Sequence, residues 1–236
     1  MERQRHSTPP PVGVTCVNQP ASIFFDLDGT LLDTEVLWAQ AARDFLQAHD
    51  VPCSQAEATA LVYGRSWHDI YADLARQHPH LATGVERVGG ELRDVLRRLR
   101  AQTDVCIRGS VDLLVRLAAA HPVAIVSGSP REDIADSVVL MGIAPCVRFF
   151  LGAEDYSPGK PAPACFLMAA RRMQVDPSAC LVFEDSTAGV RAAKAAGMAC
   201  VALVRPDAPR QDVTPADLVL DDLGTFDLER FSESMR

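Results

Sequence analysis

Two aspartates are the first residues of the chain whose types and spacing could do chemistry. Asp26 and Asp28 follow an apolar run at residues 22–25 and precede Gly29 and Thr30. A carboxylate that ends a buried strand can ligate a metal ion or attack phosphorus, and a carboxyl group two residues later faces the same side and can protonate a leaving oxygen. Such pairs also form turns and helix caps, but this position directly after an apolar run favours the catalytic interpretation.

Other polar groups also follow apolar runs. Ser127 and Gly128 come after residues 122–126, and their loop offers a hydroxyl and backbone N–H groups to an anion. Lys160 lies in a Gly-Lys-Pro turn. Such a rigid turn suits a charged side chain that must point in one direction. Taken alone, the serine is most often a turn or cap residue and the lysine a solvated surface residue. Their combination at the ends of several predicted strands favours a shared site.

Glu184 and Asp185 form an acidic pair after the apolar residues 180–183. An acidic pair is a weak signal by itself, since such pairs are common. Placed beside Asp26, the two residues would create a cluster of carboxylates that cannot all remain ionised without a cation. All-oxygen ligation favours Mg²⁺.

The chain from residue 106 onwards predicts strands that alternate with helices. Together with residues 22–25, the expected strands are 122–126, 149–151, 180–183, 199–204 and 218–220. The expected helices cover 111–120 and 131–141, a segment ending near 173, and 187–196. This alternation predicts an α/β fold with a parallel sheet covered on both faces. Ligands bind such sheets beyond the carboxyl ends of the strands, where the polar groups above are expected.

The segment between residues 34 and 103 has a different character. Its apolar residues recur at helical spacing, as at Leu92, Val95, Leu96 and Leu99, and it contains no convincing strand. Because it is too long to connect two elements of a compact sheet, a separate helical domain is predicted. Residues 1–20 are polar and rich in proline, and they predict a flexible leader.

Composition limits the partners and the compartment. The 236 residues include 23 Lys+Arg and 31 Asp+Glu, a net charge of −8, which argues against a nucleic acid or an anionic membrane as partner. Seven scattered cysteines with no Cys-x-x-Cys spacing predict neither a disulfide framework nor a zinc site. No apolar run is long enough for a membrane span, and no secretory signal is evident. A reduced, cytoplasmic location is expected.

The sequence resembles the haloacid dehalogenase-like hydrolase superfamily, and within it the branch of phosphatases and phosphomutases. The resemblance extends from about residue 22 to the end of the chain. It is carried by motifs that stand in the family's order: residues 24–34 (FFDLDGTLLDT), 127–129 (SGS), 159–163 (GKPAP), 183–190 (FEDSTAGV) and 195–198 (AAGM). The first and last motifs are highly specific, whereas the serine motif is weak in isolation.

The resemblance implies a Rossmann-like core at residues 21–35 and 106–236, with a helical cap inserted at 36–105. It implies a Mg²⁺-dependent phosphomonoester hydrolase in which Asp26 forms an aspartyl-phosphate and Asp28 is the general acid and base. Phosphate would be bound by Ser127, Gly128 and Lys160. The metal would be held by Asp26, the backbone carbonyl of Asp28, and Asp185, with support from Glu184 through water or directly. A small organic phosphate, foremost a sugar phosphate, is the expected substrate, and a monomer is the expected state.

The sequence also allows other functions. A β-phosphoglucomutase-like sugar phosphomutase is the first alternative, although Trp38 stands where that pattern has a histidine. A phosphoacceptor signalling domain is disfavoured by the helical insertion and by the Asp-x-Asp-Gly-Thr order. A dehalogenase is disfavoured by the second aspartate, Asp28. Arg65 and Trp38 are candidate specificity residues of the cap, with His68 weaker and Trp67 better explained as cap core.

Overall fold

A parallel sheet forms the centre of the molecule in the computed structural model, which describes residues 19–62, 67–81, 83–100, 102–206, 208 and 210–235. Within these residues the strand order is β3-β2-β1-β4-β5-β6. The strands are β1 Ser22–Phe25, β2 Val123–Val126, β3 Phe149–Leu151, β4 Cys180–Glu184, β5 Ala199–Leu203 and β6 Leu218–Leu220. The chain runs outward from β1 to β3 and then returns to the other side of β1, which places a topological switch point between β1 and β4. The predicted α/β fold with a Rossmann-like parallel sheet is confirmed.

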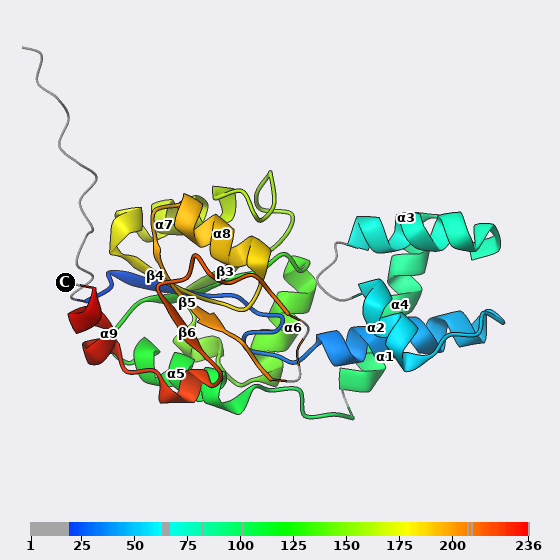
Figure 1. Ribbon diagram of the computed structural model, residues 1–236, viewed down its shortest axis with the longest axis horizontal. Coiled ribbons are helices and arrows are strands. Elements are labelled where there is room, and N and C mark those ends of the chain that lie inside the picture. Colours follow the sequence, from blue (N-terminus) through cyan, green and yellow to red (C-terminus); the bar gives the residue numbers. More distant parts are fainter. Residues whose placement is uncertain are drawn as a thin grey trace, which may run out of the picture.

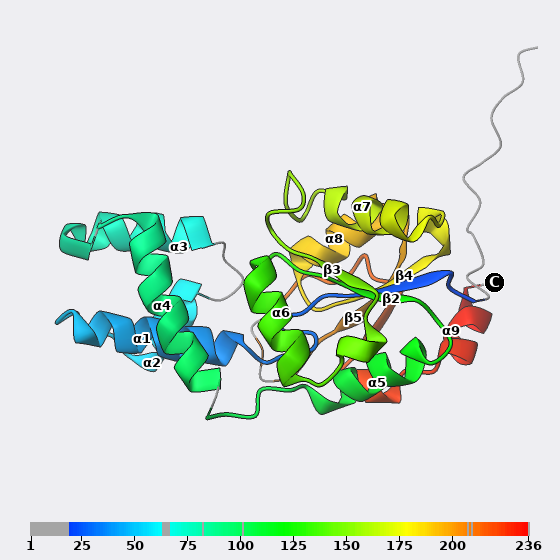
Figure 2. The same cartoon turned by 180° about the vertical axis from the view of Figure 1, so that it is seen from behind.

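Helices cover both faces of this sheet (Figure 1, Figure 2). The helices of one face are α7 Ala164–Met173 and α8 Thr187–Ala195, and those of the other are α5 Arg108–Ala118, α6 Arg131–Leu140 and α9 Leu228–Ser234. Side chains alternate between the two layers: Phe24 packs in one apolar cluster, whereas Ile23 and Phe25 pack in the other. Strand β1 is therefore apolar at nearly every position, as expected for a strand buried on both sides.

Four further helices stand beside the sheet and are called the helical insert below (Figure 1). They are α1 Glu35–Ala48, α2 Gln55–Val62, α3 Trp67–Gln77 and α4 Val85–Arg100. The chain leaves the sheet and returns to it along neighbouring paths. Leu32 forms an antiparallel bridge with Cys106, and the amide of Asp33 donates to the carbonyl of Val105 at 2.8 Å. The described part of this segment is helical, as its apolar spacing predicts.

The element boundaries differ from the sequence-based expectations mainly in α5 and α9. Helix α5 begins at Arg108, three residues before the expected start, and the seven-residue α9 is not expected at all. Gly142 follows α6 with φ +69°, which is the left-handed conformation of a helix-terminating glycine. The predicted leader at residues 1–20 lies outside the described residues, except for its last two.

A group of aromatic rings packs between β1, β4 and the C-terminal segment. Phe183 is fully buried, stacks on Phe25 at 4.6 Å between ring centroids, and meets Phe226 edge-on at 5.0 Å. We expect Phe183→Ala to lower the free energy of unfolding by about 3–5 kcal/mol, because it removes these contacts and leaves a cavity. Urea denaturation measures this change. Val139→Ala is the control, since Val139 is 75% exposed and should change stability by no more than about 0.5 kcal/mol.

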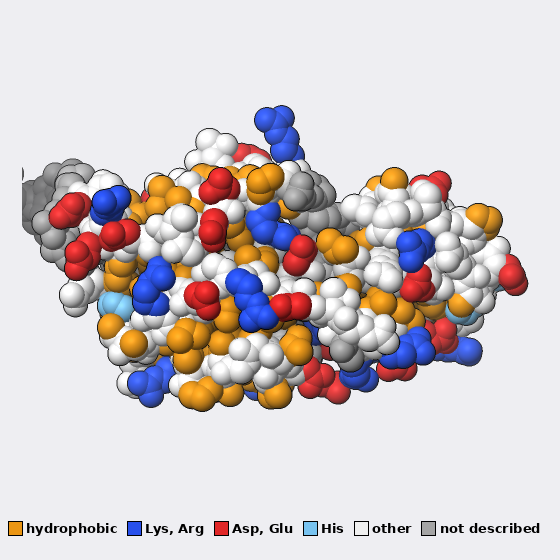
Figure 3. Space-filling view, turned by 90° about the horizontal axis from the view of Figure 1, so that it is seen from below, with side chains coloured by type: hydrophobic (Ala, Val, Ile, Leu, Met, Phe, Trp, Pro, Cys, Tyr) orange, Lys and Arg blue, Asp and Glu red, His pale blue; other side chains and the backbone are white. Residues whose placement is uncertain are grey.

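Charges of both signs are interspersed on the surface seen from below in Figure 3. Elsewhere on the molecule, opposite charges form exposed pairs, such as Arg191 with Asp212 at 3.0 Å, which contribute little to stability in solvent. Among the described residues, no helix has the length and hydrophobicity that a membrane crossing requires. The cysteines in this part of the chain are free thiols.

Candidate active site

The loop after β1 brings two distant segments of the chain together. The amide of Asp26 donates to the carbonyl of Phe183 at 2.9 Å, so pairing of β1 with β4 continues to the sheet edge. Gly29 has φ +85°, and a Cβ atom on it would overlap the carboxylate of Asp185. Thr30 Oγ1 donates to Asp185 Oδ1 at 3.2 Å. The glycine and the threonine therefore let the acidic residue after β4 lie against the loop after β1.

Three carboxylates gather at this edge. Asp26, Glu184 and Asp185 each offer an oxygen, and these oxygens all lie within 4.8 Å of one another. Lys160 Nζ donates to Asp26 Oδ1 and to Glu184 Oε1, both at 2.6 Å, and to the carbonyl of Val126 at 3.0 Å. All three ammonium protons are thereby used, and one buried cation is shared between two carboxylates.

Burial and neighbouring charges set the ionisation of this cluster. Burial raises the pKa of Asp26 well above its usual range; the positive charge of Lys160 opposes this effect, and the negative charge of Glu184 adds to it. Burial acts to lower the pKa of Lys160, but the negative charges of Asp26 and Glu184 raise it. The resulting pKa lies well above the ordinary value for lysine. The lysine therefore stays charged. Two of the three carboxylates, Asp26 and Glu184, share this one ammonium group.

Glu184 is fully buried and is held by the protein on both of its oxygens. Its Oε1 accepts from Lys160, and its Oε2 accepts from the amides of Asp185 and Ser186 and from Ser186 Oγ, each at 3.0 Å. A Cβ atom on Gly189 would overlap this carboxylate, so the first turn of α8 can approach only with glycine at that position. Glu184 thus fixes Lys160 and links β4 to α8.

Asp28 has a different environment, made of hydroxyl groups. It accepts from Thr34 Oγ1 and Ser129 Oγ, both at 2.5 Å, and from Ser127 Oγ at 3.4 Å. The backbone of Ser127 is itself fixed, because its carbonyl accepts from the Tyr156 hydroxyl at 2.7 Å. The loop after β2 is therefore bonded directly to the loop after β1.

The remaining candidates lie apart from these contacts. Gly128 is in the loop after β2, where a Cβ atom would meet nothing within 4 Å. Trp38 lies in α1, half-buried, and packs against the apolar core. Arg65 lies outside the described residues. His68 and Trp67 begin α3, but the placement of their side chains is also outside what the structure describes.

Several residues at the site had no role assigned from the sequence. Thr30, Thr34 and Ser129 belong to the quoted motifs, and hydroxyl groups beside catalytic carboxylates are a signal that could have found them. Arg100 is the last residue of α4, and its Nη2 atom lies 3.9 Å from Asp28 Oδ1. Nothing in its sequence context distinguishes it from the other arginines of that charged helix.

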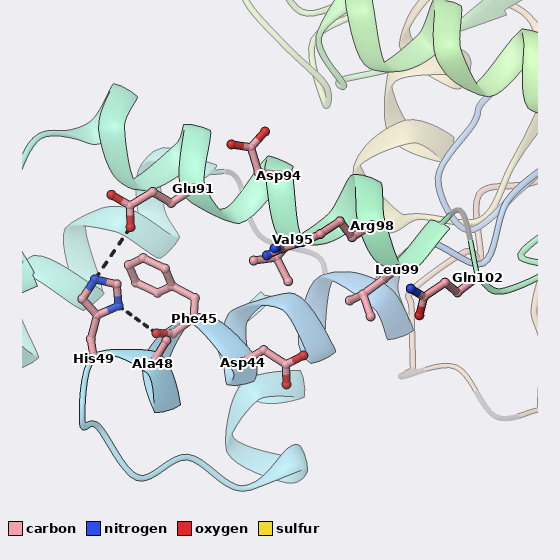
Figure 4. Close-up of a pocket in the computed structure, with 10 residues that line it drawn as sticks. All are labelled: Asp44, Phe45, Ala48, His49, Glu91, Asp94, Val95, Arg98, Leu99 and Gln102. Atoms are coloured by element: carbon pink, nitrogen blue, oxygen red, sulfur yellow. Dashed lines mark hydrogen bonds and ion pairs between the residues drawn. The ribbon is translucent and has the colours of Figure 1, made fainter.

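The structure also has a cavity of about 540 Å³ in the helical insert. Figure 4 shows that α1 and α4 line it, with His49 between the Phe45 carbonyl at 2.9 Å and Glu91 at 3.7 Å. None of the candidate site residues lines this cavity. The carboxylates and the lysine described above lie at the sheet edge instead.

Comparisons with known proteins agree with this arrangement. The family model described as haloacid dehalogenase-like hydrolase matches residues 21–197. The fructose-1-phosphate phosphatase YqaB of Escherichia coli is 31% identical over 77% of this chain and 95% of its own. The bifunctional riboflavin kinase/FMN phosphatase of Arabidopsis thaliana is 31% identical over 89% of this chain, which spans 55% of that longer protein.

A solved structure shares the fold. CbbY from Rhodobacter sphaeroides, crystallised in complex with phosphate, superposes with a TM-score of 0.76 at 22% identity, over 88% of this chain and 96% of that one. The family match covers most of the chain, including both acidic motifs and the lysine between them. The chain therefore belongs to the haloacid dehalogenase-like hydrolase family, as its sequence motifs predict.

Proposed function

We propose that this chain is a Mg²⁺-dependent phosphomonoester hydrolase that acts through a phosphorylated Asp26. One observation carries the proposal: a buried carboxylate is hydrogen-bonded to a lysine whose side chain is only 10% exposed, and one of its oxygens lies within 4.8 Å of oxygens of two more carboxylates at the switch point of a parallel sheet. Family membership and the phosphatases among the relatives support the same reaction class.

The donors present suit a small, hard dication. They are carboxylate oxygens, and two of the three carboxylates share the single positive charge of Lys160. Asp26 and Asp185, with the backbone carbonyl of Asp28, would hold Mg²⁺ directly, and Glu184 would support it through water or directly. The ion would offset the repulsion between a carboxylate nucleophile and an anionic phosphate.

In the proposed reaction, an oxygen of Asp26 attacks phosphorus while the bond from phosphorus to the leaving oxygen breaks. Asp28 gives its proton to that oxygen and then takes a proton from water, which attacks the aspartyl-phosphate and releases inorganic phosphate. Ser127 Oγ, the amide of Gly128 and Lys160 bind the phosphoryl oxygens, where charge builds up in the transition state. The hydroxyl groups of Thr34 and Ser129 orient Asp28 for proton transfer. The positive charge of Lys160 favours the ionised form of Asp26, which is the form that attacks phosphorus.

The leaving group is proposed to be a sugar or another small organic alcohol. The fructose-1-phosphate phosphatase among the relatives supports this class. We assign the helical insert, residues 36–105, as a cap over the site, with Arg65 and Trp38 as candidate specificity residues. A cytoplasmic location stays a prediction from composition, and a monomer stays the default expectation. The phosphomutase alternative is weakened by Trp38, because an indole cannot do the acid–base work of a histidine.

The test is phosphate release from a panel of small phosphoesters, with Mg²⁺ and with EDTA. We expect chelation to lower the rate by about 10²- to 10³-fold, because several kcal/mol of charge stabilisation are lost, and excess Mg²⁺ to restore it. Asp26→Asn serves as the blank. Hydrolysis that is insensitive to EDTA would exclude the proposed metal role, and interconversion of glucose 1- and 6-phosphates would favour the mutase.

A further inference from the structure

The last residue of α4 connects the helical insert to the candidate active site. The Arg100 side chain is only 12% exposed, and its Nη2 lies 3.9 Å from Asp28 Oδ1. Its Nη1 donates to Ser137 Oγ in α6 at 3.2 Å. Ser137 Oγ in turn donates to the carbonyl of Asp133 at 2.6 Å. The guanidinium therefore belongs to the helical insert but is hydrogen-bonded to α6, one of the helices that cover the sheet.

Two features separate Arg100 from an ordinary surface arginine. Its Nε atom is buried and has no hydrogen-bond partner among the described residues. Leaving such a donor unsatisfied costs about 1–3 kcal/mol, so its position is not explained by stability alone. Arg97, one turn earlier on the same helix, is 55% exposed and pairs at 3.6 Å with Glu132 of α6. That exposed pair joins the two helices without reaching the site.

Asp28 contacts a positively charged side chain of the helical insert and several neutral hydroxyl groups from other parts of the chain. The described contacts with Thr34, Ser127 and Ser129 are all hydroxyl contacts. Among the described residues, the ion pair of Asp28 is formed with Arg100, whereas Lys160 is occupied by Asp26 and Glu184. The two aspartates of the motif thus pair with different cations: Asp26 with Lys160 of the sheet domain, and Asp28 with Arg100 of the helical insert.

We infer that Arg100 is a positioning residue for Asp28. The guanidinium holds the Asp28 carboxyl group, between Thr34 and Ser129, in the orientation that faces the leaving oxygen. Because Arg100 sits on α4 and donates to Ser137 of α6, this orientation depends on the contact between Arg100 and Ser137. The inference rests on the proposed function, since it assigns Arg100 an effect only on the proton transfer that Asp28 performs.

The test compares two leaving groups that differ in their need for a proton. The p-nitrophenolate leaves without one, whereas an alkoxide needs the proton of Asp28. For Arg100→Met, we expect aspartyl-phosphate formation in single turnovers to slow by about 10- to 100-fold with the best alkyl phosphate of the panel. With p-nitrophenyl phosphate the expected loss is less than about threefold. KM should change little for either substrate, and Arg100→Lys should recover part of the rate with the alkyl phosphate.

Arg97→Met is the matched control, because it removes a cation from the same helix without touching Asp28. It should lower the rates with the two substrates equally or not at all. Equal losses for both substrates in Arg100→Met, or a selective loss in Arg97→Met, would overturn the inference. If Arg100→Met does not fold, the same leaving-group comparison on Arg100→Lys decides. Failure of the proposed function is distinguishable, since the wild-type enzyme would then release phosphate from neither substrate.

Discussion

Replacing Asp26 with asparagine is expected to lower phosphate release by about 10³-fold or more, because an amide cannot replace the carboxylate as nucleophile. Ser127 and Lys160, the proposed phosphate-binding groups, remain in this variant. Substrate binding should therefore persist while turnover is lost, and the defect should appear in kcat. Steady-state kinetics measures kcat, and mass spectrometry of acid-quenched enzyme detects the phosphoryl group expected on Asp26 in the wild-type protein.

Asp28→Asn provides the contrast for this experiment. It keeps the proposed nucleophile but loses the group that we propose activates water. With p-nitrophenyl phosphate, it should release about one equivalent of p-nitrophenolate and then stall as the phosphorylated enzyme. Substantial turnover by Asp26→Asn, or a phosphoryl group located on another residue, would show that the nucleophile lies elsewhere.

Replacing Lys160 with methionine is expected to damage both activity and stability. The variant loses the cation that we propose binds the transferring phosphoryl group, which should cost about 10²- to 10³-fold in kcat. It also leaves Asp26 and Glu184 buried without their shared cation. We expect a loss of about 3 kcal/mol in the free energy of unfolding, at the lower end for a broken buried ion pair, because Asp26 can take up a proton.

The stability loss in Lys160→Met should depend on pH. Burial already raises the pKa of Asp26 in the folded protein, and removal of Lys160 removes the charge that opposes this rise. The folded variant then holds a proton that the unfolded chain releases at lower pH. Stability therefore falls as pH rises from the ordinary carboxyl range through the raised pKa of Asp26. Urea denaturation in EDTA at several pH values measures this trend.

A double variant, Lys160→Met with Glu184→Gln, separates the two effects of the lysine. Removing one of the two uncompensated carboxylates should restore part of the stability, whereas activity should stay low because the phosphate-binding cation is still missing. A fully active Lys160→Met enzyme would contradict the proposed phosphate-binding role. An unchanged unfolding free energy at all pH values would contradict the proposed importance of the buried ion pairs.

The sheet and the main acidic cluster were predictable from the sequence for a physical reason. Parallel strands end at one edge, so Asp26, Lys160 and Asp185 had to approach one another once their strands and loops were identified. Helix α9 was missed because its seven residues contain too few apolar positions to show a period. Its packing is decided instead by Phe231, which contacts Phe226 in the aromatic group.

The surroundings of Asp28 were less predictable. Thr34 and Ser129 stand within recognised motifs, but the sequence does not state which way their hydroxyl groups turn. Arg100 lies on a helix with several other arginines, and only the docking of α4 against α6 singles it out. A contact between the helical insert and the helices of the sheet depends on their relative placement, and apolar periodicity carries no information about that placement.

The antiparallel bridge between Leu32 and Cys106 has a consequence for the history of the enzyme. Because the chain departs from the sheet and rejoins it at adjacent points, the intervening helices can be lengthened, shortened or exchanged with little strain on the strands. Under the proposed assignment of these helices as a cap, evolution can change the choice of substrate there while the proposed catalytic residues at the sheet edge stay intact.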